Sequence, residues 1–338
     1  MPASVPTIDK SISDNLRIAS FLATLMVLSR HAMDLEAFYG IDNPCVWITK
    51  IEYGMSIFTE IAVPYFFVVS GFFFFQHNYY ERGEYYSMVK HKLQTLFIPF
   101  IIWNVVGAPL FFFKNPHEFN QPLWNYLTQL LNSDWYGPLW YVRDLMLFMI
   151  LVPIYQWAIS MKCRWFTGML LLAVLYHWSP IDCSLLSSEG LVFFILGGIL
   201  ARYPQSLSYR IPVLILLLIT GIWLYSCFSM IGWSGELIHK LNTTVGVFIF
   251  WQWLGFIQGR IRMFLLRVSQ YSFFVYVLHF YIEKALKVTV AYYFPMNDIV
   301  ALLTFLLLPI IVAALLVEIG VVYKKYIPSI YSFSTGGR

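Results

Sequence analysis

Residues 14–34 read DNLRIASFLATLMVLSRHAMD, and this stretch decides the fold. It is apolar from Ile18 to Leu28 and polar at both ends, which is typical of a helix that crosses a lipid bilayer. Arg17 and His31 are fourteen positions apart, which is roughly 21 Å along a helix and roughly 40° around its axis. One face therefore carries a fixed cation near one membrane surface and an imidazole near the other. Polar groups in such places are candidates for a functional site.

The composition places the whole chain in the membrane class. Of its 338 residues, 59% are hydrophobic and 12% are charged, which is about half the charged fraction of a typical soluble domain. Mean hydropathy is +0.67 and the net charge is +4. There is no basic soluble segment large enough for a nucleic-acid module. Because no separate apolar leader precedes residue 16, we expect the first helix to target the chain and to stay in place.

The four cysteines, Cys45, Cys163, Cys183 and Cys227, show no metal-binding spacing. The simplest interpretation is four isolated apolar or loop cysteines. A disulfide between Cys45 and Cys183, in two predicted outer loops, is the alternative.

Ten hydrophobic stretches follow one another along the chain. They lie at residues about 16–35, 53–76, 91–113, 138–160, 164–179, 189–203, 210–230, 242–259, 271–293 and 298–323. The fifth and sixth are short for a bilayer that needs about 20 residues, and residues 119–131 are too short and mixed to span, so they are expected in the interface. No internal repeat is apparent. We predict a single membrane domain over residues 1–338, with spans at about 16–323 and a cytoplasmic tail at 324–338.

The basic residues predict the orientation. With the N-terminus in the cytoplasm, fifteen lysines and arginines fall on the cytoplasmic side and six on the opposite side. Cytoplasmic loops of membrane proteins carry such an excess. We therefore predict an all-α polytopic membrane protein with about ten transmembrane helices and both termini in the cytoplasm. Arg17 then lies at the cytoplasmic side and His31 near the outer side.

His31 is the candidate catalytic residue. A neutral imidazole accepts a proton at physiological pH, and acyl transfer to a hydroxyl needs a base within hydrogen-bond reach of the attacking oxygen. Asp34, one turn further on, is expected to hold the other ring nitrogen and to stabilise the imidazolium. The alternative is a histidine that ends a helix among lipid headgroups. For the neighbouring Arg30 we expect the role of an interfacial anchor.

Three cations are candidates for binding phosphate. Arg17 offers forked donors, while Lys90 and Lys92 bind phosphate as point charges. For each of them the alternative is a cation that anchors a cytoplasmic segment.

Two charges inside predicted spans need partners. Glu60 should face the protein interior, with Arg143 as its candidate partner. Arg143 is expected to pair with Asp34 or Glu60, or to stabilise a developing oxyanion. Trp140, three positions before Arg143, belongs either to an aromatic belt at the outer interface or to a surface that stacks on a sugar.

Small residues predict close helix contacts. Ser70 and Gly71 allow another backbone or a ligand to approach the second span, and Gly197 and Gly198 predict close packing of the sixth. Pro64 predicts a kink in the second span.

The ninth span carries a further polar face. His279, Glu283 and Lys287 follow one another at intervals of four, so they share one face of a helix. His279 either orients a ligand or closes a polar network with Glu283.

These segments together resemble the acyltransferase-3 family of integral membrane acyltransferases. The matching motifs are DNLR with His31 on the first span, the Pro-x-Phe-Phe-x-x-Ser-Gly pattern at 64–71, the basic cluster before Pro99, Gly-Pro-Leu-Trp at 137–140, the Phe-x-x-Gly segment at 194–197, and Ser-Phe-x-x-Tyr-x-x-His at 272–279 with Tyr276 and His279. The motifs appear in the family's order and cover nearly the whole chain.

The resemblance implies an enzyme that moves an acyl group, most often acetyl, from acyl-coenzyme A to a hydroxyl of a cell-surface or lipid-linked carbohydrate. It implies His31 as the catalytic residue, with no metal and no tightly bound cofactor, and acetyl-CoA or another acyl-CoA as co-substrate. The partners would be the lipid bilayer, the donor and the carbohydrate, and the location a bacterial inner membrane. The predicted substrate-binding residues are Arg17, Lys90, Lys92, Ser70, Trp140, Arg143 and His279, and the supporting residues are Asp34, Glu60, Tyr276 and Glu283.

Two other functions remain open at this point. An exporter or flippase for a lipid-linked polysaccharide would use the same cavity without making a bond. A purely structural membrane subunit would leave Arg143, Glu60 and His31 unexplained.

Overall fold

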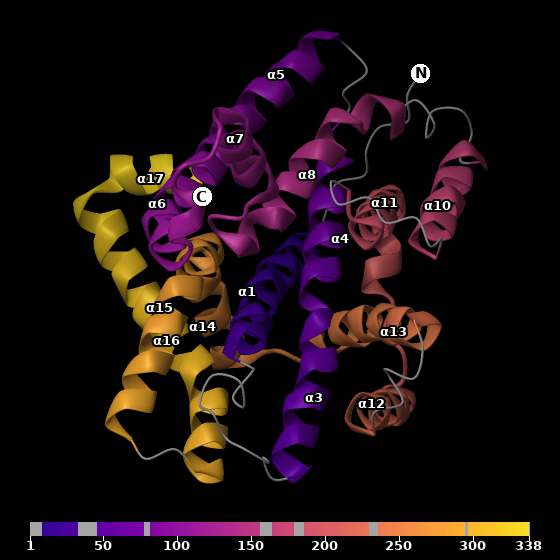
Figure 1. Ribbon diagram of the computed structural model, residues 1–338. Coiled ribbons are helices and arrows are strands. Elements are labelled where there is room, and N and C mark those ends of the chain that lie inside the picture. Colours follow the sequence, from indigo (N-terminus) through magenta and orange to yellow (C-terminus); the bar gives the residue numbers. More distant parts are fainter. Residues whose placement is uncertain are drawn as a thin grey trace. The chain divides into compact units, whose positions relative to one another are not determined.

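The computed structural model of the protein describes residues 9–32, 46–77, 82–155, 164–178, 186–229, 236–294 and 297–337. In these ranges every regular element is a helix and there is no strand (Figure 1). The all-α prediction is therefore confirmed. Asp34 and three of the cysteines (Cys45, Cys163 and Cys183) lie outside the described residues, whereas Cys227 is a buried free cysteine.

The helices form two compact units, which are described separately. The α1 unit is built within residues 9–66 and 205–322. It contains α1 (Lys10–Ala32), α3 (Val46–Glu60), the start of α4 (Ala62–Phe74), α12 (Val213–Phe228), α13 (Glu236–Leu254), α14 (Gly259–Ser269), α15 (Ser272–Tyr293) and most of α16 (Asp298–Tyr326). In this unit α1 packs against α3, α14 and α15, and α12 packs against α3 and α13.

The α8 unit is built within residues 67–204 and 323–337. It contains the rest of α4, α5 (Arg82–Lys92), a π-helical turn η1 (Leu93–Phe97), α6 (Ile98–Lys114), η2 (Pro116–Glu118), α7 (Leu123–Asn132), η3 (Gly137–Leu139), α8 (Trp140–Ile150), α10 (Arg164–His177), α11 (Ser188–Arg202) and α17 (Pro328–Thr335), while η4 (Pro204–Ser208) links the two units. Here α11 packs against α8 and α10, and α17 packs on α6. The indole of Trp103 donates to the carbonyl of Ser334 at 2.9 Å and ties α17 down.

Several hydroxyl groups on the apolar helices form hydrogen bonds within their own helix. Ser20 donates to the carbonyl of Leu16 at 2.8 Å, Thr24 to that of Ser20 at 2.9 Å, and Thr304 to that of Val300 at 2.7 Å. A bilayer offers no water to such groups, so these bonds let the polar residues lie in apolar helices at little cost.

The predicted close packing at the small residues is found inside the α8 unit. A Cβ atom on Gly71 would overlap the carbonyl oxygen of Phe194, and one on Gly197 would overlap the backbone of Val68. The backbones of α4 and α11 therefore touch where both helices have glycine. Pro64 follows the interruption at Ile61 that separates α3 from α4, as expected of a residue that removes a helical hydrogen bond.

By length and composition, four helical segments of the described chain can cross a membrane: Lys10–Ala32, Lys50–Phe74, Gly83–Lys114 and Asp298–Tyr326. A fifth arises if α14 and α15, bent by 72°, count as one span. These segments coincide with five of the predicted stretches. Among the remaining stretches, α12 is apolar but shorter than these segments. The total of about ten and the sides of the termini stay predictions.

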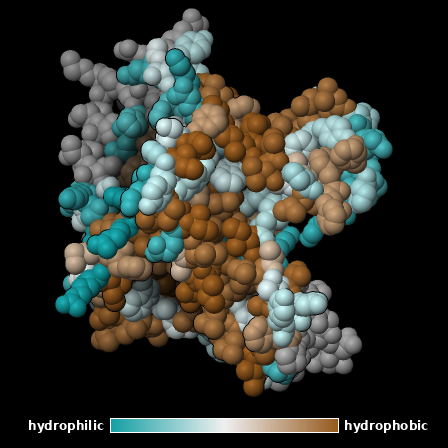
Figure 2. Space-filling model, turned by 90° about the vertical axis from the view of Figure 1, so that its left-hand side faces the viewer, coloured by the Kyte–Doolittle hydropathy of each residue, from teal (hydrophilic) through white to brown (hydrophobic). Residues whose placement is uncertain are grey.

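The surface is that of a membrane protein. On the face shown in Figure 2, hydrophobic residues cover broad areas. On α16 alone, Ile299, Leu303, Ile310 and Ile311 expose about half or more of their surface, at 66%, 49%, 61% and 53%. Soluble proteins rarely expose contiguous apolar surface on this scale.

Candidate functional site

Two histidines meet where α1 and α15 pack together. His31 lies in the last turn of α1 and His279 in the middle of α15, with ring centroids 5.2 Å apart and ring planes 42° apart. The ring of Phe280 meets His31 edge-on at 5.1 Å. On the next turns of α15, the ammonium group of Lys287 donates a hydrogen bond to the backbone carbonyl of His31. The end of α1 is thereby attached to α15 beside the two imidazoles.

The tautomer of His279 follows from its hydrogen bond. Its Nδ1 lies 2.6 Å from the carbonyl oxygen of Tyr276. A carbonyl can only accept, so Nδ1 carries the hydrogen, and Nε2 of the neutral ring is an acceptor. His279 is fully buried, and Nε2 has no hydrogen-bond partner in the described part of the chain. A buried acceptor therefore lies next to His31.

Glu283 is a second buried side chain with polar atoms that form no hydrogen bond among the described residues. Its side chain is 1% exposed, and neither carboxylate oxygen has a hydrogen-bond partner among the described residues. Lys287, one turn further on, is 5% exposed. The predicted shared face of His279, Glu283 and Lys287 is thus found buried, but His279 and Glu283 do not hydrogen-bond to each other. Buried groups of this kind usually have partners, so their presence points to a functional role.

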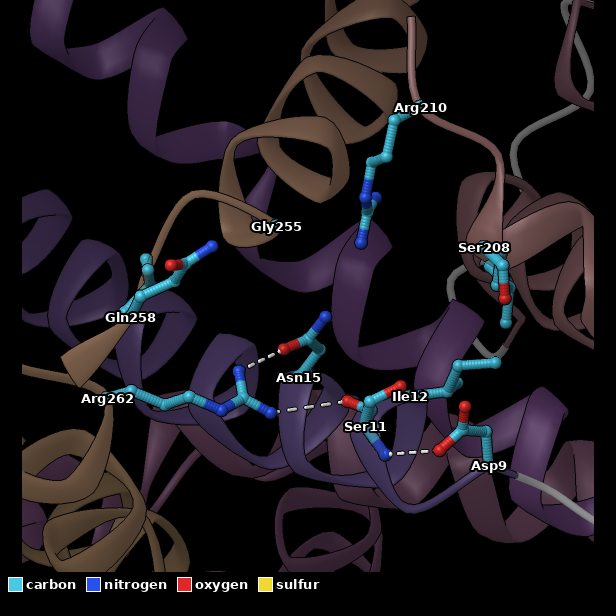
Figure 3. Close-up of a pocket in the computed structure, with 11 residues that line it drawn as sticks. Asp9, Ser11, Ile12, Asn15, Ser208, Arg210, Gly255, Gln258 and Arg262 are labelled. Atoms are coloured by element: carbon cyan, nitrogen blue, oxygen red, sulfur yellow. Dashed lines mark hydrogen bonds between the residues drawn. The ribbon is translucent and has the colours of Figure 1, made fainter.

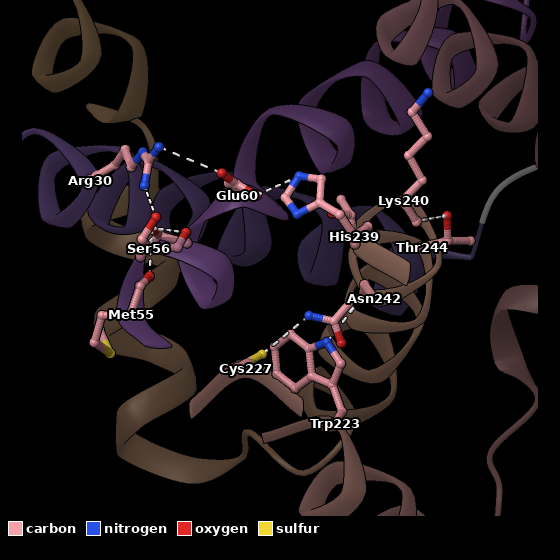
Figure 4. Close-up of polar contacts among 12 residues, drawn as sticks. Arg30, Met55, Ser56, Glu60, Trp223, Cys227, His239, Lys240, Asn242 and Thr244 are labelled. Atoms are coloured by element: carbon pink, nitrogen blue, oxygen red, sulfur yellow. Dashed lines mark hydrogen bonds and ion pairs between the residues drawn. The ribbon is translucent and has the colours of Figure 1, made fainter. Parts of the chain in front are cut away.

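Glu60 has two partners in the α1 unit that the sequence did not predict. Sequence reasoning named Arg143, but the structure pairs Glu60 inside the α1 unit with Arg30 at 3.5 Å and with His239 at 3.0 Å (Figure 4). Arg30 also donates to the hydroxyl of Ser56. Arg30, expected as an interfacial anchor, therefore joins α1 to α3. Hydropathy placed Glu60 inside a span but contained no signal for His239, because the contact depends on how α13 packs.

Further polar contacts surround this network on α12 and α13. The indole of Trp223 donates to the carbonyl of Asn242 at 2.9 Å, and the Asn242 amide lies 3.4 Å from the sulfur of Cys227 (Figure 4). The role of Cys227 is therefore to pack in the interior of the α1 unit.

Arg143 belongs to the α8 unit and pairs with its own neighbour. Its guanidinium makes a two-point contact with Asp144 Oδ1 at 2.8 Å. The other oxygen of the buried Asp144 accepts from the backbone of Ser187 at 3.1 Å, at the start of α11. This pair attaches α8 to α11 inside the α8 unit. The expected pairing with Asp34 or Glu60 stays a prediction, because Asp34 lies outside the described residues and Glu60 belongs to the α1 unit. The adjacent Asp144 is the residue that sequence reasoning missed.

The remaining predicted residues are spread over both units. Ser70 hydrogen-bonds to the hydroxyl of Tyr141 at 2.8 Å, and Trp140 is half-buried on α8. Lys90 is exposed, and the ammonium group of Lys92 lies 4.7 Å from the ring of Phe74. Arg17 is exposed on α1, and the buried ring of Tyr276 contacts Phe66 at 6.2 Å. Their substrate-binding or supporting roles stay predictions.

A model of an acyltransferase domain matches residues 14–318. Comparisons with curated proteins and with solved structures gave no match. The matched region includes the paired histidines and most of the chain. The protein therefore belongs to the acyltransferase-3 family of integral membrane acyltransferases.

Proposed function

We propose that this membrane acyltransferase moves an acetyl group from acetyl-coenzyme A to a hydroxyl of a cell-surface or lipid-linked carbohydrate, in the inner membrane of a bacterium, with His31 as the general base. The observation that supports this most directly is the pair of imidazoles 5.2 Å apart on α1 and α15. The imidazole of His31 can accept the proton of a hydroxyl, and the acceptor nitrogen of the neighbouring His279 can stabilise the imidazolium that forms.

In the proposed reaction, His31 takes the proton from the acceptor hydroxyl as its oxygen attacks the thioester carbonyl. The tetrahedral intermediate then collapses, the carbon–sulfur bond breaks, and the ester remains on the carbohydrate. The departing thiolate takes the proton from the His31 imidazolium and leaves as free coenzyme A. The imidazolium is stabilised by the lone pair of His279 Nε2, a role that the sequence gave to Asp34.

His31→Ala tests this function. Membranes with the full chain are incubated with radiolabelled acetyl-coenzyme A, and label in the polysaccharide fraction is counted per inserted protein. We expect transfer to fall by roughly 10²–10⁴-fold, the usual contribution of a general base. His117→Ala is the matched control, because this side chain is 74% exposed outside the site. A normally inserted His31→Ala protein with the wild-type rate would overturn the proposal.

The same assay separates the enzyme from an exporter. A bond-making enzyme needs the thioester, so label appears only when acetyl-coenzyme A is supplied. An exporter would instead move unmodified glycan at the same rate with and without the donor.

A further inference from the structure

A second polar region of the α1 unit lies at the N-terminal end of α1 (Figure 3). It is a cleft of about 440 Å³, lined by side chains that include Asn15, Ser208, Arg210, Gln258 and Arg262. These residues come from three segments far apart in the sequence: the start of α1, the chain before α12, and the start of α14. The basic-residue count predicted all three segments on the cytoplasmic side.

Arg210 is the main cation of the cleft. Its guanidinium donates to the carbonyl of Trp251 at 3.2 Å and lies 5.4 Å from the centre of the Trp251 ring. A Cβ atom on Gly255 would come within 2.6 Å of Arg210 Nε, so glycine there makes room for the guanidinium. Arg210 has no carboxylate partner in the described part of the chain. Its remaining N–H groups are therefore available to a ligand.

Arg262 orients Asn15 toward the cleft. It donates to Asn15 Oδ1 at 2.5 Å and to the carbonyl of Ser11 at 3.5 Å, and it lies 3.7 Å from Asp14. A guanidinium can only donate, so the oxygen of the Asn15 amide faces Arg262 and the NH₂ group remains for the cleft. Figure 3 shows Asn15, Arg210 and Gln258 extending toward the same space.

The start of α14 adds to this donor set. The helix begins at Gly259, and no side chain caps its first amides. Such amides and the positive end of the helix dipole favour an anion. Asp9 is the opposing charge: it lines the cleft, and its carboxylate accepts from the backbone of Ser11 at 2.9 Å.

We propose that this cleft binds a phosphate group, with the nucleotide end of the acyl-coenzyme A donor as its source; this assignment rests on the proposed function. Phosphate offers several acceptor oxygens and negative charge, which match guanidinium, amide and hydroxyl donors. Asn15 and His31 are sixteen positions apart on one helix, about 24 Å along its axis. A donor with phosphates at one end and its thioester at the other suits two sites separated in this way. A phospholipid headgroup carries the same chemistry and is the other source to test.

Binding is tested without turnover. The purified full chain in phosphatidylcholine nanodiscs is titrated with adenosine 3′,5′-bisphosphate by calorimetry. We expect Arg210→Gln to weaken binding by roughly tenfold or more, because it removes a charge-assisted contact. Arg267→Gln removes the same charge from an exposed position on α14 outside the cleft and should leave binding unchanged.

A second pair of variants covers the case in which Arg210→Gln disturbs the fold. Ser208→Glu adds a carboxylate inside the cleft, and Gln205→Glu adds one to the same short helix η4 outside it. Both positions are exposed. Only Ser208→Glu should weaken binding, whereas Asp9→Asn should strengthen it. Measurable binding of the bisphosphate that is equal in wild type, Ser208→Glu and Gln205→Glu would overturn the proposal.

The lipid source is tested with nanodiscs that contain phosphatidylglycerol. If wild type ignores the bisphosphate but is stabilised by this lipid, and Ser208→Glu is not stabilised, the cleft binds the phosphate of a headgroup. If neither probe distinguishes the variants, there is no phosphate site here.

Failure of this inference can be told apart from failure of the proposed function. Wild type is assayed with acetyl-coenzyme A and with S-acetylpantetheine, which lacks the nucleotide. If the cleft binds the donor, wild type prefers acetyl-coenzyme A and Ser208→Glu loses that preference. If the preference persists in Ser208→Glu, the cleft does not bind the donor. If wild type uses neither thioester, the proposed function and the assignment to the donor fail, while the titrations still decide whether phosphate binds.

Discussion

The two imidazoles of the candidate site have different surroundings. His279 is fixed in one tautomer by the carbonyl of Tyr276 in its own helix, whereas His31 lies in the last turn of α1 and is only partly buried. The partly accessible ring is the better proton acceptor for an incoming hydroxyl. The buried ring is better suited to orient and stabilise it.

Variants of His279 test this division of roles. Phe keeps an aromatic ring at this position but offers no acceptor, whereas Gln keeps one. We expect His279→Phe to lower the transfer rate by at least roughly tenfold relative to His279→Gln, because a hydrogen bond to a charged group is worth about 1.5–3 kcal/mol. Initial rates per inserted protein measure this, and equal rates for the two variants would assign His279 a packing role only.

Lys287 and Glu283 are expected to depend on each other. Both are buried one turn apart on α15, on one face of the helix. Lys287→Met leaves a buried carboxylate without its cation and should destabilise the protein by about 3–5 kcal/mol. The double variant Glu283→Gln/Lys287→Met removes both charges and should lose less stability than Lys287→Met alone. Thermal unfolding in detergent compares them; a double variant at least as unstable as Lys287→Met would show that the charges are not coupled.

Direct contact between helix backbones brings α4 and α11 together in the α8 unit. Gly71 and Gly197 place α4 and α11 in direct contact, and the sequence predicted this because membrane helices associate through small residues. The Arg143–Asp144 pair then attaches α8 to the start of α11. Polar and small residues thus supply packing that the hydrophobic effect cannot supply between helices in lipid.

Alanine substitutions measure that contact. Gly197→Ala would push a methyl group into the backbone of α4, and such overpacking typically costs about 1–3 kcal/mol. Gly168→Ala is the matched control: it lies in α10 with no atom near its would-be Cβ, so it should stabilise the helix by roughly 0.5–1 kcal/mol. Thermal unfolding of both variants checks this. Similar shifts in the two would contradict a close α4–α11 contact.

Helix existence and helix faces were predictable, whereas ion-pair partners were not. Periodicity placed His279, Glu283 and Lys287 on one face, because spacing along a helix fixes direction around its axis. It could not show which helix that face meets. It therefore gave no sign of the observed partners, which are Arg30 and His239 for Glu60 and the neighbouring Asp144 for Arg143. The cleft at Arg210 was missed for the same reason, since its three segments meet only in the fold.

For the whole molecule, the open question is how many helices cross the bilayer. Four segments, or five with the bent α14–α15 pair, are long and apolar enough among the described residues, while the charge pattern predicts about ten. Whether the short helices α10 and α11 cross the membrane distinguishes ten spans from eight. If both cross, the chain between them lies outside the cell; if they form a hairpin on one side, it stays in the cytoplasm.

Single cysteines placed in a background without the four native ones test the topology. Trp178, at the end of α10, and Gln205, after α11, are exposed in the structure. If the two short helices cross, a membrane-impermeant maleimide labels Trp178→Cys in intact cells but labels Gln205→Cys only in inside-out vesicles. Glu84→Cys and Ile330→Cys should behave like Gln205→Cys, and Lys114→Cys like Trp178→Cys, because the excess of basic residues lies on the cytoplasmic side. Labelling of Trp178→Cys from the cytoplasmic side, with the other four unchanged, would reduce the count to eight spans and still leave His31 near the outer surface.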